Sequence, residues 1–225
     1  MISAVLFDLD ETLLDRTRSL VAFLGDQHRR FGDRLGRAPF AAWRDHFLTL
    51  DARGHVDKSV VYPAILSDFG GDQGAADALL ADYRKRCCRY AKAFPGMADT
   101  LRTLRARGLR LGVVTNGETE FQMRHVDALG LRDLVDCVLV SQAEGLRKPE
   151  ADLFLRAVAR LAAEPGQCLF VGDNPVVDVL GAHAAGLRTA WFGREATWPR
   201  DLPPVPGAII DTLPQVLDLV AGHEP

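Results

Sequence analysis

Short, continuous apolar runs recur along this chain, and they constrain its fold more than any other feature of the sequence. They are expected to form strands buried on both faces of a parallel sheet, because strands with one wet face alternate apolar and polar residues. The runs lie at residues 4–7, 109–114, 137–140 and 168–171, with a weaker one at 189–192 and a last short one at 208–210.

Amphipathic helical patterns separate these runs, and several of them end at a glycine, as helices often do. The patterns cover residues 99–107, 118–129, 151–163 and 175–185. Alternation of buried strand and helix is typical of an α/β fold with a doubly wound parallel sheet. We predict that fold for this chain.

Residues 17–90 interrupt the alternation, because they contain no convincing strand. Their apolar residues recur at helical spacing, for example around Phe23, Trp43, Ile65 and Leu79. We therefore predict an all-helical domain, residues 16–92, inserted into an α/β domain made of residues 1–15 and 93–225.

Composition excludes several classes of function. The chain has 225 residues, a net charge of -3 and a pI near 6.1, which gives no basic surface for a nucleic acid polymer or a membrane. No leader peptide and no apolar stretch long enough to span a bilayer is visible. The four cysteines form no CxxC motif, which favours reduced structural thiols and a cytoplasmic location. The sequence leaves the oligomeric state open.

Polar residues follow the predicted strands where each strand ends. In open parallel sheets, ligands bind at the carboxyl ends of the strands. The residues expected there are Asp8 and Asp10 after the first strand, Thr115 and Asn116 after the second, Lys148 beyond the third, and Asp173 and Asp178 after the fourth.

Four carboxylates in one pocket repel one another, and one lysine cannot balance them. A divalent cation can, and an all-oxygen ligand set suits Mg²⁺, which commonly completes its shell with substrate phosphate. An Asp carboxylate can accept a phosphoryl group, while a second one gives a proton to the leaving oxygen and later takes one from water.

With these residues in place, the chain resembles the haloacid dehalogenase-like (HAD) superfamily of phosphohydrolases. The family's four motifs occur in order along nearly the whole chain. They are matched by Asp8-Leu9-Asp10-Glu11-Thr12, by Val113-Val114-Thr115-Asn116-Gly117, by Arg147-Lys148-Pro149, and by Gly172-Asp173 with Asp178 five residues after that aspartate. Each motif alone is weak, and the ordered set is specific.

The resemblance implies a role for each matched residue. Asp8 would be the nucleophile that forms an aspartyl-phosphate, and Asp10 the general acid and base. Thr115 and the Asn116 amide would bind the transferring phosphate, and Lys148 would neutralise the phosphate and Asp8.

The resemblance also implies a metal site and a substrate-selecting domain. Mg²⁺ would be held by Asp8, the Asp10 backbone carbonyl and Asp173, with Asp178 acting through water or orienting Lys148. The helical insertion resembles the C1 cap of the family. The branch with phosphoglycolate phosphatases and 5′-nucleotidases is the most similar, which implies a small phosphorylated metabolite as substrate.

Other interpretations remain open at this point. A haloacid dehalogenase uses the first aspartate without a metal and lacks the second, and a phosphohexose mutase uses both. A phospho-accepting signalling module also combines Asp, Thr and Lys-Pro, but it is shorter and carries its acceptor on a later strand. Without the other motifs, Lys148 would be a surface lysine and Asp178 a favourable charge in a first helical turn. Glu11 stands where many HAD members have Gly or Asp, and its side chain is expected to alternate away from Asp8 and Asp10.

Overall fold

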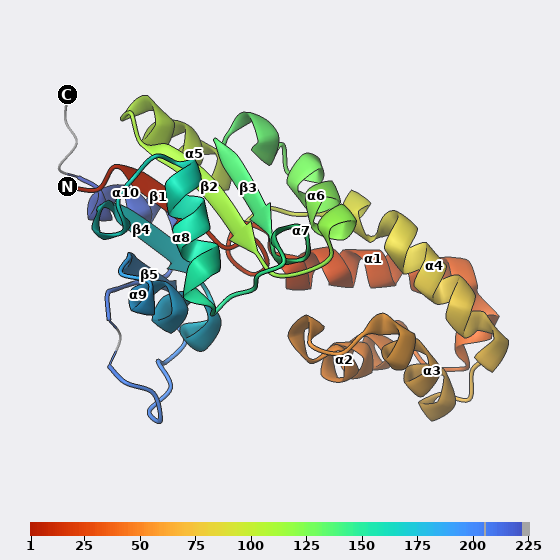
Figure 1. Ribbon diagram of the computed structural model, residues 1–225. Helices are drawn as coiled ribbons and strands as arrows, with labels where there is room; N and C mark the ends of the chain where they lie inside the picture. The colour runs from red at the N-terminus through yellow and green to blue at the C-terminus, as the bar shows by residue number, and fades with distance from the viewer. Residues whose placement is uncertain (205, 222–225) are drawn as a thin grey trace. The chain divides into compact units, whose positions relative to one another are not determined.

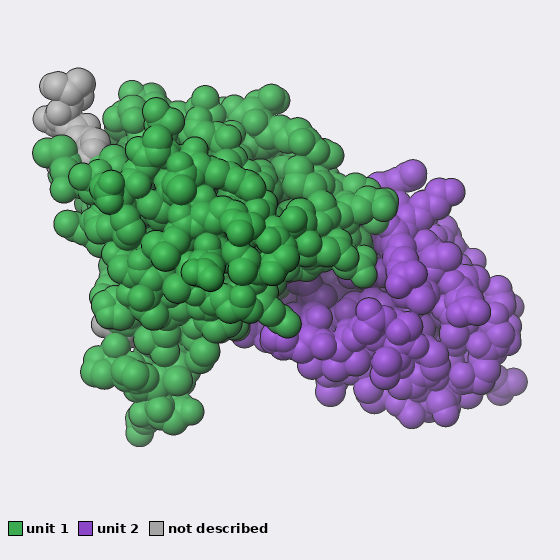
Figure 2. Space-filling model, in the orientation of Figure 1, with its two compact units in different colours: residues 1–15, 93–225 green, residues 16–92 purple. Residues whose placement is uncertain are grey.

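The computed structural model describes residues 1–204 and 206–221. The chain forms two compact units, one made of residues 1–15 and 93–225 and the other of residues 16–92 (Figure 2). We call them the core unit and the helical unit.

The core unit is built on one six-stranded sheet, and every strand pair in it is parallel. The strand order is β3-β2-β1-β4-β5-β6. The strands are β1 Ala4–Phe7, β2 Arg110–Thr115, β3 Cys137–Val140, β4 Cys168–Gly172, β5 Arg188–Phe192 and β6 Ala208–Ile210. The predicted doubly wound α/β fold is confirmed, since each apolar run forms a strand.

Helices cover both faces of this sheet (Figure 1). One face carries α8 (Ala151–Arg160) and α9 (Gly181–Ala184), which contribute Leu153, Phe154 and Ala182 to a cluster with Leu6 and Phe170 from the sheet. On the other side, α5 (Met97–Ala106) packs against β2 and against α10 (Val216–Leu219). Two covered faces explain why β1 and β4, in the middle of the sheet, are buried along their whole length and carry no charged residue.

The strand order places β1 at the point where the winding reverses. β1 has β2 on one side and β4 on the other, so the chain leaves β1 in one direction and returns beside it. The crevice at such a switch point, outside the carboxyl ends of the strands, is where open α/β sheets bind ligands. The first residue past β1 is Asp8, whose amide donates to the Val171 carbonyl of β4 at 2.9 Å.

The helical unit contains four α-helices, joined in part by short 3-10 turns, and no strand among residues 16–92. They are α1 Arg16–Phe31, α2 Phe40–Asp51, α3 Lys58–Asp68 and α4 Ala76–Arg86. Trp43, Phe47 and Tyr62 are among its fully buried side chains. No helix in the described part of the chain has the length and apolar character needed to cross a membrane.

An ionic cluster lies at the C-terminal end of α2 in the helical unit. The Asp51 carboxylate accepts hydrogen bonds from both terminal nitrogens of Arg16, at 2.9 and 3.0 Å, and lies 2.5 Å from Lys58 Nζ. The two residues that follow, Ala52 and Arg53, have positive φ. This cluster therefore fixes a sharp turn between α2 and α3.

None of the four cysteines forms a disulfide. Burial raises the pKa of Cys137 and Cys168 to about 11, so these two thiols are uncharged near neutral pH. Their state agrees with the structural role expected from the sequence.

Candidate active site

A buried lysine joins two carboxylates at the carboxyl edge of the sheet. Lys148 Nζ lies 2.6 Å from Asp8 Oδ1 and 2.7 Å from Asp178 Oδ1, and all three residues are buried. Lys148 reaches them from the loop between α7 (Ser141–Glu144) and α8, and its peptide bond to Pro149 is cis. A lysine so enclosed must be paired, because an isolated buried charge is very costly.

Burial and neighbouring charges shift the pKa values of this group. Burial raises the pKa of Asp8 well above its ordinary value, Lys148 opposes this, and the charges of Asp178 and Asp173 add to it. Burial by itself would lower the pKa of Lys148, but the carboxylates of Asp178 and Asp8 outweigh it and raise that pKa. The pKa of Asp8 thus stays raised although the Lys148 ammonium lies beside it.

Asp178 is fixed by the backbone that follows β4. A π-helical turn spans Pro175–Leu180, where the sequence predicts regular helix, and α9 continues it. Asn174 caps this turn by accepting from the amides of Val176 and Val177, as its place before a proline predicts. Asp178 Oδ2 accepts from the Asn174 amide at 2.9 Å.

Gly172 is required for this close packing. A Cβ added to it would lie 2.5 Å from Cβ and 2.6 Å from Cγ of Asp178. The carboxylate of Asp178 can reach Lys148 from this position only because the end of β4 has no side chain at residue 172.

Residues of β5 and of the loop after it contact Asp173. The Trp191 indole donates to the Asp173 carbonyl at 2.8 Å, and one Arg194 nitrogen lies 4.0 Å from the Asp173 carboxylate. Another Arg194 nitrogen donates to Glu11 at 2.7 Å. The chain turns at Glu11, where φ is 63°, so its side chain does not follow the strand alternation expected from the sequence. Neither Arg194 nor this pairing of Glu11 is foreseen from the motifs.

Asn116 ties the second motif to the third. Its amide nitrogen donates to the Lys148 carbonyl at 3.0 Å, and its side-chain oxygen accepts from the Lys148 amide at 2.9 Å. Thr115, the last residue of β2, is fully buried. The two residues expected to bind phosphate are thus part of the same hydrogen-bonded framework as the lysine.

The Asp10 carboxylate has a different environment from that of Asp8. Gln122, on α6 (Thr119–Ala128), donates to Asp10 Oδ2 and to the Thr115 hydroxyl, both at 2.7 Å. The motifs give no role to this glutamine.

Three of the expected metal ligands lie together. One carboxylate oxygen from each of Asp8, Asp173 and Asp178 falls within 4.8 Å of the other two, a spacing that fits a single bound cation. Asp10 does not contribute its carboxylate to this group, which leaves its backbone carbonyl as the ligand that the family resemblance implies. The unbalanced negative charge and the all-oxygen donor set suit a hard divalent cation.

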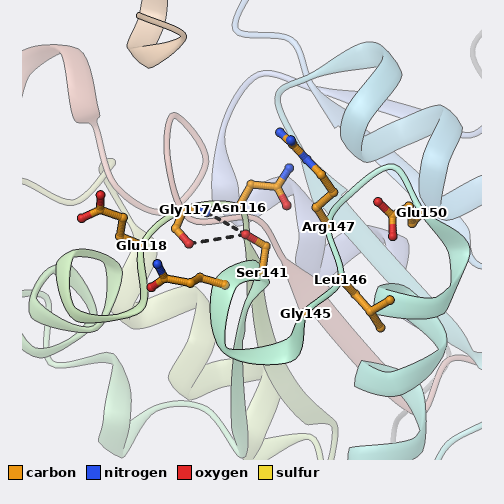
Figure 3. A pocket seen from close by; sticks show the side chains of 9 residues that line it. Asn116, Gly117, Glu118, Ser141, Gly145, Leu146, Arg147 and Glu150 are labelled. Atoms are coloured by element: carbon orange, nitrogen blue, oxygen red, sulfur yellow. Dashed lines mark hydrogen bonds between the residues drawn. The ribbon is translucent and has the colours of Figure 1, made fainter. Parts of the chain in front are cut away.

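A shallow groove of about 430 Å³ adjoins this site (Figure 3). It runs between the loop after β2 and the segment from α7 (Ser141–Glu144) to Glu150. The Ser141 hydroxyl accepts from the Gly117 amide at 2.9 Å and so joins the two walls.

Comparison with known proteins shows the family of this chain. A family model described as haloacid dehalogenase-like hydrolase matches residues 2–186. The chain belongs to this family. The glyceraldehyde 3-phosphate phosphatase of Methanopyrus kandleri is 30% identical to this HAD-like hydrolase, over 98% of this chain and 97% of the relative.

Solved structures of the family share the fold of this HAD-like hydrolase. The HAD-hydrolase YfnB of Bacillus subtilis, solved with bound magnesium, superposes with a TM-score of 0.74 at 22% identity, covering 98% of this chain and 99% of that one. The 2-haloacid dehalogenase of Pseudomonas syringae has a TM-score of 0.66 and 29% identity, with the same coverage. A HAD phosphatase of Thermococcus onnurineus also has a TM-score of 0.66, at 27% identity over the whole of both chains. Because fold similarity extends to both a phosphatase and a dehalogenase, the reaction must be argued from the site.

Proposed function

We propose that this HAD-like hydrolase is a Mg²⁺-dependent phosphomonoesterase that acts on a small phosphorylated metabolite through an aspartyl-phosphate. The observation that carries the proposal is the buried Asp8–Lys148–Asp178 arrangement, with Asp173 within the same 4.8 Å group of carboxylate oxygens. The phosphatase named among the relatives, which aligns over nearly the whole chain, supports it.

In the proposed reaction, a carboxylate oxygen of Asp8 attacks phosphorus and the bond to the leaving alcohol oxygen breaks. Asp10 gives that oxygen a proton. Water then attacks the phosphorus of the aspartyl-phosphate, Asp10 takes its proton, and inorganic phosphate leaves with Asp8 restored. Lys148 neutralises charge on the phosphate, and Thr115 and the Asn116 amide orient it.

Asp8, the Asp10 carbonyl and Asp173 would hold Mg²⁺, with Asp178 close by and bonded to Lys148. When bound, the ion supplies the positive charge that favours an ionised Asp8 and offsets the charge on phosphate oxygens. The helical unit, residues 16–92, is proposed to act as the cap that selects the substrate and excludes water.

The proposal is tested by phosphate release from p-nitrophenyl phosphate and from a panel of phosphorylated metabolites. The panel includes glyceraldehyde 3-phosphate, phosphoserine, phosphoglycolate and nucleoside monophosphates. We expect activity that needs Mg²⁺, is lost in EDTA, and falls about 10³-fold or more in Asp8→Asn. The control Asp133→Asn makes the same chemical change at an exposed position in the core unit. Halide release from a 2-haloacid without added metal, with no phosphate release, would contradict the proposal and favour a dehalogenase.

A further inference from the structure

One amide nitrogen in the core unit contacts three oxygens at the reaction site. Gln122 Nε2 donates to Asp10 Oδ2 and Thr115 Oγ1, both at 2.7 Å, and lies 3.3 Å from the Asn116 carbonyl. The Gln122 side chain is buried, and it comes from the first turns of α6. It therefore links the predicted acid and base to the predicted phosphate-binding residues.

The orientation of this amide follows from its partners. A carboxylate oxygen and a backbone carbonyl can only accept, so the group that faces them must be the NH₂ of the glutamine. The opposite orientation would place the amide oxygen against the Asp10 carboxylate. Hydrogen bonds with an ionised partner are the stronger kind, so this contact favours one arrangement of Asp10.

The glutamine is also held in place by its surroundings. Gly117 has φ of 146°, and a Cβ there would lie 2.9 Å from Gln122 Cγ, so the loop after β2 packs directly against the glutamine. At the start of the same helix, the Thr119 amide donates to the Gln142 side chain at 2.8 Å. Gln122 is thus preorganised to act on Asp10.

We propose that Gln122 is a positioning residue that fixes the carboxyl group of Asp10 for proton transfer. Because Oδ2 accepts from Gln122, Oδ1 is the oxygen left to carry the proton to the leaving group and to receive one from water. This inference rests on the proposed phosphomonoesterase function. It assigns Gln122 no contact with the substrate.

Leaving groups of different acidity separate this role from a structural one. An alkyl phosphate releases a poor leaving group, so its departure needs the proton from Asp10. p-Nitrophenyl phosphate releases a stable phenolate that departs without it. If Asp10 is misplaced, the attack of Asp8 on an alkyl phosphate therefore releases the alcohol more slowly. Release of nitrophenolate from p-nitrophenyl phosphate stays nearly unchanged.

The test uses Gln122→Met, which keeps the length of the side chain and removes both donors. Single-turnover release of nitrophenolate and of alcohol from an alkyl phosphate is measured with the full-length enzyme in excess and Mg²⁺ present. We expect alcohol release to fall about 10- to 100-fold, the range for losing a charged hydrogen bond at a general acid, with nitrophenolate release within about threefold of wild type. Gln142→Met is the matched control, because that glutamine binds the start of α6 without contacting Asp10.

Equal slowing of both substrates, or unchanged alcohol release, would overturn the inference. Crystal structures of the wild type and the variant give a readout independent of activity. The Asp10 carboxylate is expected to rotate away in Gln122→Met, and an unmoved carboxylate would also overturn the proposed role. If the wild type hydrolysed neither ester, the phosphatase proposal would fail while these structures still decided the role of Gln122. Gln122→Glu replaces the methionine variant if the latter does not fold.

Discussion

Replacing Lys148 by methionine is the perturbation whose consequences the structure defines most sharply. Its ammonium lies 2.6 Å from Asp8 and 2.7 Å from Asp178, and the lysine side chain is 2% exposed. Methionine retains most of the chain length and removes the charge. Two buried carboxylates then lose their shared cation, a change that costs about 3–5 kcal/mol in the free energy of unfolding.

The pH dependence of this loss has a definite sign. The pKa of Asp8 is already raised in the folded wild type, mainly by burial, and removing the ammonium raises it further. A carboxyl group whose folded pKa exceeds its unfolded value destabilises the fold when ionised, and the penalty disappears as it binds a proton. The raised pKa of Lys148 likewise contributes stability that is fully present at neutral pH. The free energy of unfolding that Lys148→Met loses relative to wild type should therefore be largest at neutral pH and become smaller as the pH falls toward about 5.

The measurement is urea denaturation followed by tryptophan fluorescence in EDTA, for both proteins over this pH range. Lys85→Met serves as the matched control, because Lys85 is exposed on α4 and the same replacement there should change stability by about 0.5 kcal/mol or less. A deficit below about 1 kcal/mol at neutral pH, or one that grows on acidification, would refute the electrostatic argument.

Two further substitutions test other contacts. Gly172→Ala places a methyl group 2.5 Å from Asp178 Cβ, so we expect about 1–3 kcal/mol of destabilisation and loss of phosphatase activity, measured by denaturation and by phosphate release. Asp51→Asn in the helical unit removes the buried carboxylate that pairs with Arg16 and Lys58. It should cost about 3 kcal/mol in thermal denaturation, and a change below about 0.5 kcal/mol would show that the cluster contributes nothing net.

The fold could be predicted because its determinants are local. A strand buried on both faces is largely apolar, so the runs that become β1, β2 and β4 are visible in the sequence without knowledge of their partners. Asn174 before Pro175 likewise predicts a helix start, and the structure has one there. The π-helical turn that follows is not visible in the sequence, because it depends on how Asp178 packs against Gly172.

The parts of the candidate site that depend on contacts between residues far apart in the sequence could not be predicted. Gln122 lies 112 residues from Asp10, and Arg194 lies 183 residues from Glu11. Strand order, which brings β1 beside β2 and β4, creates the first contact, and the loop after β5 creates the second. The glutamine-bearing helix after Thr-Asn-Gly is visible in the sequence and resembles one branch of the family, but nothing local to α6 indicates that Gln122 contacts Asp10.

The contacts of Asp10 also bear on which reaction the site favours. Displacement of halide from carbon releases a weakly basic ion that needs no proton, so the first step of a dehalogenase has no use for a general acid. Hydrolysis of an alkyl phosphate releases a strongly basic oxygen and then requires a water to be deprotonated, and one carboxyl group can serve both steps. A buried glutamine that donates to Asp10 and to Thr115 therefore favours ester hydrolysis over dehalogenation. The carboxylates of Asp8, Asp173 and Asp178 favour it for a separate reason, because a bound cation would reduce the repulsion that remains between them beside Lys148 and Arg194.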